Sequence, residues 1–410
     1  MKYRFLLMIW LSVSSLQTMA DSQPGPEPDR LRSLGDAFLS DFYHYPDHDL
    51  VVAGRLLRQQ ALEASQSLMH AAQNLRVLYT STDGVDGVTI RPVSGAVYLP
   101  HGEPPPDGWP LVSWSHGTVG IADPCAPSWN GRQSQDEDYL NAYLSAGYAV
   151  VASDYQGLGT AGTHPYLATR PAAFSNLDLI RAAQQAGLPI SAKVLMLGQS
   201  QGASAAIATA GLAAEYAPTV EVVGVIATGS PYFTPAAMAA LSRLKQPDAP
   251  DPRLGYTFLA MTLAEQLETD FIRQDYITDE AWPIAEMVNT LCYHDLRQQV
   301  QDAGLTRRQS FQRDPMQGLQ TAFVAMGYPR LLLPVPVFMG IGGEDRDTPP
   351  KMQLQLARSL CKAGTRVTVH QYPDLDHRQV VPGSVADSMT FARALFDGHT
   401  PEDSCDAILD

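Results

Sequence analysis

The fold is decided by the stretch Val194-Leu195-Met196-Leu197-Gly198-Gln199-Ser200-Gln201-Gly202, which continues into an Ala-rich segment that ends near Tyr216. The apolar run is typical of a buried strand, and the Ala-rich segment favours a helix. The Gly-x-Ser-x-Gly pattern at the junction therefore predicts a sharp strand-to-helix turn with Ser200 at its tip. Strand and helix pass so closely at such a turn that only glycine fits at positions 198 and 202. The competing interpretation is a chance glycine-rich turn.

Strands and helices alternate on both sides of this turn. Apolar runs predict strands at residues 111–115, 148–153, 193–197, 220–226, 335–341 and 366–371, and helical spacing predicts helices at 136–146, 175–186, 201–216, 351–363 and 385–396. This alternation predicts an α/β fold, in which a mostly parallel sheet is flanked by helices. Ahead of it, residues 76–82 and 88–99 predict an antiparallel hairpin. Residues 30 to about 74 show helical spacing, so we expect a helical extension outside the sheet.

The alternation stops between residues 230 and 330, where the pattern is mainly helical. Loops beyond the carboxyl ends of parallel strands face the ligand site, so an insertion there is well placed to cover it. We expect an inserted helical cap; the alternative is an extra subdomain with a purely structural role. The expected organisation is a signal peptide at 1–20, a first core part with the extension at 21–229, the cap at 230–330 and a second core part with a short tail at 331–410.

The composition is that of a globular enzyme of one or two domains. The chain has 410 residues, of which 45% are hydrophobic and 17% charged, and its formal net charge is −15. This charge argues against nucleic acid and against anionic membrane surfaces as electrostatic partners. The oligomeric state is left open by the sequence.

The N-terminus predicts export. Lys2 and Arg4 precede a mostly apolar run at residues 5–16, and Ala20 ends a small-residue cleavage site. The mature chain is expected to begin at Asp21, in the periplasm or outside the cell. The run is too short for a convincing membrane span of about 18 residues or more. A retained anchor is the alternative.

Export makes disulfides the expected state of the cysteines. The chain has four, Cys125, Cys292, Cys361 and Cys405, and their spacing does not fit a compact zinc site. Four cysteines permit three pairings, of which we choose Cys125 with Cys292 and Cys361 with Cys405. The second bond would tie the short tail after the last helix to the helix that ends near Cys361.

A serine nucleophile needs a base and an acid that orients the base. His377 follows the predicted strand at 366–371, so it can reach the edge of the sheet where Ser200 lies. Asp345 and Asp347 follow the strand at 335–341, and we favour Asp345 as the acid. The neighbouring acids Glu344 and Asp376 are interpreted as solvated or capping charges.

The oxyanion that forms during acyl transfer needs two N–H donors. One is expected from the backbone amide of Gln201, the residue after the nucleophile. The other is expected from the loop after the strand at 111–115, where Gly117 allows the backbone to turn its amide inward and Thr118 stands beside it. An ordinary turn at the end of the strand is the alternative. Asp154, in a glycine-rich loop near the site, is expected to hold that loop through backbone hydrogen bonds.

Three blocks of this sequence resemble the secretory lipase family of α/β-hydrolases. They are Ser115-His116-Gly117-Thr118-Val119-Gly120-Ile121-Ala122-Asp123-Pro124-Cys125-Ala126-Pro127-Ser128, Asp154-Tyr155-Gln156-Gly157-Leu158-Gly159 and His164-Pro165-Tyr166-Leu167. The likeness extends from about residue 43 to residue 396, and Ser200, Asp345 and His377 fall where that family keeps its triad. Relatives often carry histidine before the nucleophile, whereas Gln199 stands here.

The resemblance implies an α/β-hydrolase fold with a cap between its two halves, and secreted hydrolysis of carboxylic esters without a cofactor. It also supports the Cys125 to Cys292 disulfide, which would run from the oxyanion loop into the cap. The expected substrate is a small-molecule or lipid ester, with at most a transient contact with a lipid surface. Three alternatives remain: a serine peptidase or amidase with the same triad, a non-catalytic binding protein of the same fold, and a purely structural secreted protein.

Overall fold

The computed structural model describes residues 34–46, 50–234, 237–238 and 248–409. The chain divides into two units, residues 1–32 and 33–410. The expected signal peptide at 1–20 and its cleavage site lie outside the described residues. Within those residues, no helix is long and apolar enough to cross a bilayer.

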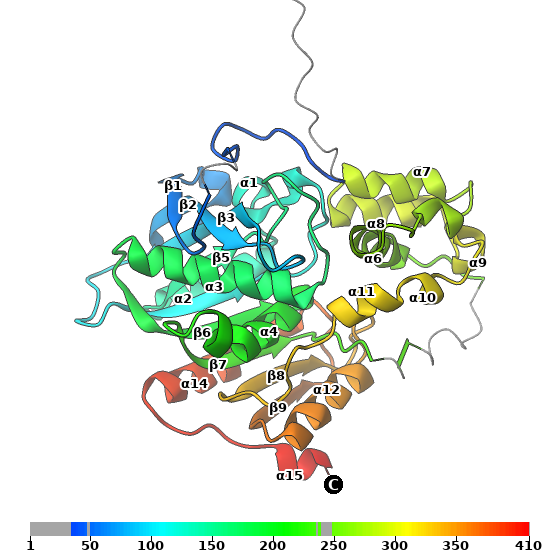
Figure 1. Cartoon of the computed structure of the whole chain (residues 1–410). Helices are drawn as coiled ribbons and strands as arrows, with labels where there is room; N and C mark the ends of the chain where they lie inside the picture. The colour runs from blue at the N-terminus through cyan, green and yellow to red at the C-terminus, as the bar shows by residue number, and fades with distance from the viewer. Residues whose placement is uncertain (1–33, 47–49, 235–236, 239–247, 410) are drawn as a thin grey trace, which may run out of the picture. The chain divides into compact units, whose positions relative to one another are not determined.

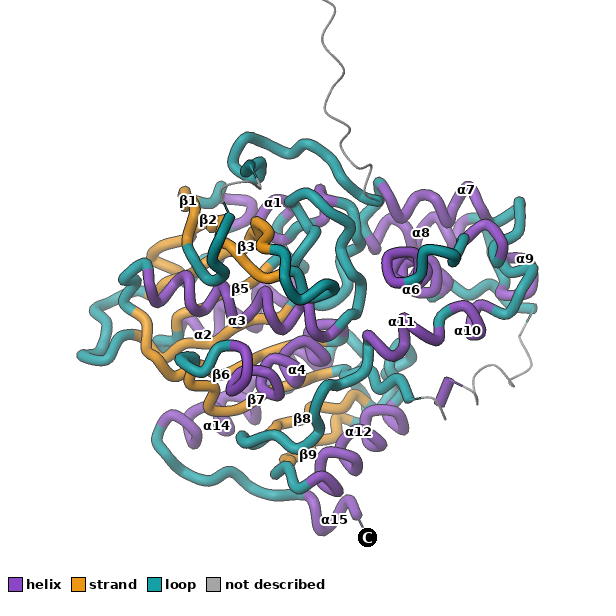
Figure 2. Tube along the Cα trace, viewed as in Figure 1, coloured by secondary structure: helices purple, strands orange, loops and turns teal. Residues whose placement is uncertain are grey.

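All the described strands belong to one sheet of nine, in the order β1-β2-β3-β5-β4-β6-β7-β8-β9 (Figure 2). β1 (Leu56–Ala61), β2 (Ala71–Thr82) and β3 (Ile90–Pro100) are antiparallel neighbours, and β3 also runs antiparallel to β5 (Ala149–Ser153). From β5 onward the strands are parallel, as the alternation predicted. They are β4 (Trp109–Ser115), β6 (Ile190–Gln199), β7 (Glu221–Thr228), β8 (Val337–Gly342) and β9 (Val367–Tyr372).

Helices cover both faces of the sheet (Figure 1). One face packs against α3 (Thr169–Gln185), α4 (Gln201–Tyr216) and α12 (Pro350–Ala363) through an apolar cluster that includes Ile180, Ile207 and Leu356. The other face packs against α2 (Ser134–Ser145) and α14 (Val385–Phe396) through a second cluster. Helices were predicted at these places. Because they bury both faces of the sheet, its strands show the unbroken apolar runs seen in the sequence. The architecture is that of an α/β-hydrolase.

The expected helical extension at residues 30–74 is wrong in its described part. That part contains β1, a 3-10 turn at Ala64–Gln66 and the start of β2. Leu, Arg, Gln and Ala give residues 56–61 a high helix propensity, but pairing with β2 and the sheet edge overrides it. Arg58 ties the preceding segment to this strand, because its guanidinium donates to the carbonyl oxygens of Phe42 and His44 at 3.2 and 3.0 Å.

The described part of the segment between β7 and β8 is mainly helical and has a core of its own. Its longer helices are α6 (Leu254–Leu267), α8 (Tyr293–Asp302) and α11 (Gln320–Ala325), with short turns α7 (Trp282–Ala285), α9 (Arg307–Ser310) and α10 (Pro315–Gly318) between them. Figure 1 shows these helices gathered beside the sheet, and α11 packs against α6. Met261 and Leu263 are fully buried there, and the same cluster includes Ile121 and Tyr166 from the core loops. We call residues 254–325 the helical insertion.

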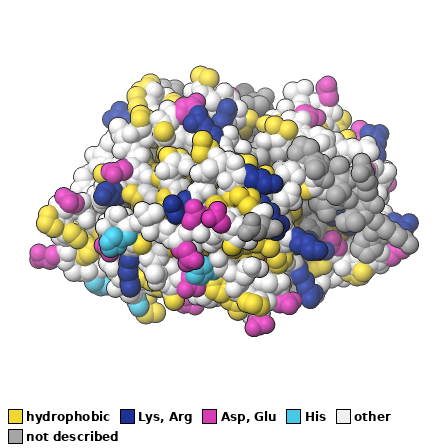
Figure 3. Space-filling view, turned by 90° about the horizontal axis from the view of Figure 1, so that it is seen from below, with side chains coloured by type: hydrophobic (Ala, Val, Ile, Leu, Met, Phe, Trp, Pro, Cys, Tyr) yellow, Lys and Arg dark blue, Asp and Glu magenta, His cyan; other side chains and the backbone are white. Residues whose placement is uncertain are grey.

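The structure pairs Cys125 with Cys292 and Cys361 with Cys405, which is the pairing that we chose. The first bond joins the loop after β4 to the start of α8. The second joins α12 to the C-terminal helix α15 (Cys405–Leu409). On the face drawn in Figure 3, acidic and basic side chains are interspersed among apolar ones.

Candidate active site

The strand-to-helix turn predicted around Ser200 is present. β6 ends at Gln199, α4 begins at Gln201, and Ser200 between them has φ 56° and ψ −120°. A non-glycine residue with positive φ is strained and persists only where its surroundings fix it. The Ser200 amide donates to the carbonyl oxygen of Thr228 at 2.9 Å, which ties the turn to the end of β7.

Two close approaches explain why glycine flanks the serine. A Cβ atom at position 202 would lie 1.8 Å from the carbonyl oxygen of Ser115, and one at position 198 would lie 2.0 Å from the carbonyl oxygen of Gly202. Both distances are far below van der Waals contact, and both partners are backbone atoms that cannot move aside. The turn therefore excludes any side chain at these two positions.

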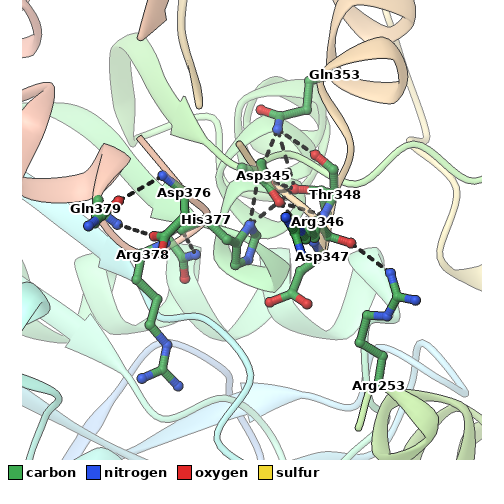
Figure 4. A network of polar contacts seen from close by, with 12 residues as sticks. Arg253, Asp345, Arg346, Asp347, Thr348, Gln353, Asp376, His377, Arg378 and Gln379 are labelled. Carbon is green, nitrogen blue, oxygen red and sulfur yellow. Dashed lines mark hydrogen bonds and ion pairs between the residues drawn. The ribbon is translucent and has the colours of Figure 1, made fainter. Parts of the chain in front are cut away.

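The predicted base and acid meet through one short hydrogen bond. His377 Nδ1 lies 2.7 Å from Asp345 Oδ2, and the two residues face each other in Figure 4. Both are buried, with exposed fractions of 7% for His377 and 3% for Asp345. A carboxylate can only accept, so Nδ1 donates the proton and Nε2 is left as the acceptor.

Four further donors hold the Asp345 carboxylate. The amides of Asp347 and Thr348 donate to Oδ1 at 2.9 and 2.8 Å. The Thr348 hydroxyl and the Gln353 amide donate to Oδ2 at 2.8 and 2.9 Å. Burial acts to raise the pKa of Asp345, but the hydrogen bond and charge of His377, together with the Thr348 donors, lower it below 3.8. The acid is thereby kept ionised.

Asp347, the alternative acid, faces the helical insertion. Its Oδ2 lies 3.4 Å from Arg297 Nη1, and the Tyr256 hydroxyl donates to the same oxygen at 3.4 Å. Arg253 adds a contact from the same side by donating to the Arg346 carbonyl oxygen at 3.1 Å (Figure 4). The structure thus brings Asp345 to the histidine and turns Asp347 toward α6 and α8.

His377 and the serine turn share their neighbours. A Cβ atom at Gly229, the residue after Thr228, would lie 2.8 Å from His377 Cε1. From the other side, the Gln199 side chain donates to the His377 carbonyl oxygen at 3.3 Å. The same side chain lies against Gly117, where a Cβ atom would be 2.3 Å from Gln199 Oε1. Gln199 therefore bridges the histidine loop and the loop after β4.

The two predicted oxyanion donors are free. Among the hydrogen bonds of the described residues, neither Gly117 N nor Gln201 N has an acceptor within the protein. Gly117 follows β4 and lies against Gln199, the residue before the serine, and Gln201 begins α4 directly after it. Backbone N–H groups that are unpaired at such a place are suited to a developing negative charge. Thr118 points its hydroxyl to the Tyr166 hydroxyl at 2.9 Å.

One polar residue of this region, Gln353, carries no readable signal in one sequence. Gln353 in α12 donates to Asp345 from eight positions away, and a lone glutamine in a helix does not indicate such a contact. Asp154, which was predicted to hold its loop, accepts from Ser94 Oγ at 2.7 Å and from the Ser128 amide at 2.9 Å, so its side chain ties the start of the loop to β3 and to residue 128.

Comparisons with known proteins show which proteins this chain is similar to. Residues 128–241, which include the serine turn, match the family model described as secretory lipase. The resemblance to the secretory lipases is confirmed. Lipase A of Moesziomyces aphidis is 23% identical over 404 residues, covering 92% of this chain and 84% of that protein. The secreted triacylglycerol lipase LIP5 of Malassezia furfur is 33% identical over 132 residues, covering 29% of this chain and 34% of that protein.

Solved structures give the same fold. Candida antarctica lipase A in its closed state superposes with a TM-score of 0.71 at 19% identity, covering 89% of each chain. The rice cell wall degrading esterase LipA of Xanthomonas oryzae superposes with a TM-score of 0.64 at 20% identity, covering 85% of this chain and all of that one. These structures show the fold, whereas the family match and the lipases named above support a carboxylic ester hydrolase of the lipase or esterase type.

Proposed function

We propose that this secretory lipase relative hydrolyses carboxylic esters in two steps through an acyl-enzyme on Ser200. His377, oriented by Asp345, takes the proton from the Ser200 hydroxyl as its oxygen attacks the ester carbonyl. The amides of Gly117 and Gln201 hold the oxyanion, and His377 returns the proton to the alcohol that leaves. Water then attacks the acyl-enzyme with the same groups in the same roles.

The observation that carries this proposal is the His377 to Asp345 hydrogen bond at 2.7 Å beside the strained Ser200 turn. An ionised carboxylate that orients a histidine next to a serine is the arrangement that activates a serine hydroxyl as a nucleophile. The free amides of Gly117 and Gln201 support the same reaction. The proposed acyl-transfer steps need no cofactor.

The decisive variant is Ser200→Ala. Turnover of p-nitrophenyl butyrate should fall by about 10⁵-fold or more, because the nucleophile is removed. The control is Ser204→Ala, one turn further along α4, which should keep nearly full activity. Circular dichroism should show both variants folded. Esterase activity retained by Ser200→Ala would end the proposal.

Further assays on the unmodified protein can separate the alternatives. A peptidase or amidase would turn over the amide matched to the ester at a comparable rate, whereas an esterase should prefer the ester strongly. A non-catalytic binding protein would leave Ser200 unlabelled by a fluorophosphonate. The names of the relatives favour esters, and a series of p-nitrophenyl esters from short to long acyl chains, with and without an emulsion, would define the substrate.

We also propose that the chain is exported after cleavage behind Ala20. The secretory family match, the secreted relative from Malassezia furfur and the two disulfides support export. N-terminal sequencing of the exported protein should begin at Asp21. A mature protein that keeps Lys2 and Arg4 would point to a retained anchor instead.

A further inference from the structure

Backbone strain in this protein is concentrated in the region of the proposed site. Among the described residues, only Tyr155, Leu167 and Ser200 combine a side chain with a positive φ. Ser200 is the proposed nucleophile, and the other two belong to the loop between β5 and α3. Such strain is retained where it serves a purpose, so Tyr155, with φ 71°, requires an explanation.

The backbone at Tyr155 is fixed by three successive amides. Asp154 N donates to the Ser94 carbonyl oxygen at 2.9 Å, and Tyr155 N donates to Ser153 Oγ at 2.9 Å. Gln156 N donates to Ser175 Oγ at 3.2 Å. This network holds the strained conformation and directs the Tyr155 ring under the loop that follows β4.

The Tyr155 hydroxyl contacts the peptide that carries one of the oxyanion donors. It donates to the carbonyl oxygen of His116 at 3.0 Å. That carbonyl and the N–H of Gly117 belong to one peptide unit, and in a trans peptide they point in opposite directions. Among the described residues there are no cis peptides. By anchoring the oxygen, Tyr155 therefore fixes the direction of the Gly117 N–H.

Two buried imidazoles hold the phenol ring in place. The His116 ring stacks on Tyr155 with centroids 4.2 Å apart, and the His164 ring lies parallel to it at 6.0 Å. Burial lowers the pKa of both histidines to about 4, so the stack is uncharged near neutral pH. His164 Nδ1 donates to the Gln156 carbonyl oxygen at 2.9 Å, which leaves Nε2 to accept from the Gln201 side chain at 3.0 Å.

We propose that Tyr155 is a positioning residue for the oxyanion hole, which its hydroxyl preorganises by holding the His116 to Gly117 peptide. The inference rests on the proposed function, since it assigns a role to Tyr155 in the same reaction. Tyr155 acts through Gly117 and does not touch the reacting atoms. Without its hydroxyl, the peptide can rotate and the N–H no longer points steadily at the oxyanion.

The test is Tyr155→Phe, which keeps the stacked ring and removes only the hydroxyl. For p-nitrophenyl butyrate we expect kcat to fall by about 10- to 100-fold, below the loss for complete removal of an oxyanion donor. KM should stay within about 2-fold, because the donor acts mainly on the transition state. A boronic acid that forms a tetrahedral adduct with the serine should bind more weakly by a factor similar to the loss in kcat.

Tyr139→Phe is the matched control. Tyr139 is equally buried, on the opposite face of the sheet, and its hydroxyl donates to Ser388 Oγ at 3.0 Å. Its loss should lower the melting temperature about as much as Tyr155→Phe does and leave kcat unchanged. Fluorotyrosine at position 155, which keeps the hydroxyl and nearly the same shape, should retain kcat within about 3-fold and so remains informative if Tyr155→Phe does not fold.

Three outcomes would overturn the inference: the same kcat in Tyr155→Phe and Tyr139→Phe, a loss in KM alone, or a loss with fluorotyrosine as large as that with phenylalanine. These results differ from a failure of the proposed function. If Ser200→Ala stays active, the proposed function is wrong. If Ser200→Ala is inactive while Tyr155→Phe behaves as its control does, only the role of Tyr155 is wrong.

Discussion

The two sides of the proposed site are held in different ways. On the acid-base side, Asp345 and His377 are fixed by charge and by hydrogen bonds from side chains and turn amides. On the oxyanion side, neutral buried rings surround the two proposed donors: the Tyr155 hydroxyl donates to the His116 carbonyl oxygen, and His164 accepts from the Gln201 side chain. In the proposed mechanism, the carboxylate that assists proton transfer and the amides that hold the oxyanion are thus positioned by separate parts of one fold.

The difference predicts that a substitution on the acid-base side lowers kcat more than a substitution on the oxyanion side. Asp345→Asn removes the negative charge that stabilises the imidazolium and exchanges an acceptor for a potential donor at His377 Nδ1. We expect kcat to fall by about 10³- to 10⁴-fold, well beyond the loss for Tyr155→Phe. The measurement is kcat for p-nitrophenyl butyrate in both variants. A smaller loss in Asp345→Asn than in Tyr155→Phe would reverse the ranking of the two sides.

The pH dependence should report the acid-base side alone. Because the pKa of Asp345 lies below 3.8, this carboxylate stays ionised throughout the range of about pH 5 to 8 in which imidazoles titrate. We therefore expect kcat/KM to fall about tenfold per pH unit on the acid limb, with the slope of one proton. A flat profile through this range would contradict a histidine base.

The contribution of Asp345 to stability should be lost at a lower pH than activity is. The lowered pKa of Asp345 in the folded state gives a contribution to stability that is present above the unfolded value of about 3.9 and is lost as the pH falls through the folded value. Activity lost on the acid limb, where this contribution is still present, should thus return on neutralisation. Activity that does not return on neutralisation would indicate unfolding instead.

The smallest effect is expected where the acid-base side meets the helical insertion. Asp347→Asn weakens contacts to Arg297 and Tyr256 that are long, at 3.4 Å each, and partly exposed. Such pairs contribute less than about 1 kcal/mol, so kcat should stay within about 3-fold and the melting temperature should fall only slightly. A loss of kcat as large as that in Asp345→Asn would mean that contacts with the helical insertion are needed to position Asp345.

The parts of the site that were predictable from sequence are those with a strict local requirement. Gly198 and Gly202 stand where a Cβ atom would collide with backbone, and so they leave a readable pattern around Ser200. Asp345 and His377 could be located because each follows a parallel strand. The sheet and its covering helices were predictable for the same reason, since burial on both faces imposes long apolar runs.

The rest depends on tertiary contacts that no local pattern carries. Residues 56–61 have helical composition and become a strand because an edge of the sheet is available. Tyr155 contacts a carbonyl oxygen 39 positions away, and Gln353 contacts Asp345 from a different element, so neither residue type indicates its contact in the sequence. The choice of Asp345 over Asp347 rested on spacing, and the direction that each side chain takes could come only from the fold.

The disulfide between Cys125 and Cys292 makes a covalent ring of the chain between them. The two cysteines are 167 positions apart, so the ring contains the serine turn, the loop of Tyr155 and the first half of the helical insertion. Closing a loop of this length restricts the unfolded chain by about 5 kcal/mol. A protease that cuts once inside the ring opens the chain without releasing a fragment. The nicked protein would still migrate as one species until a reductant separates its pieces.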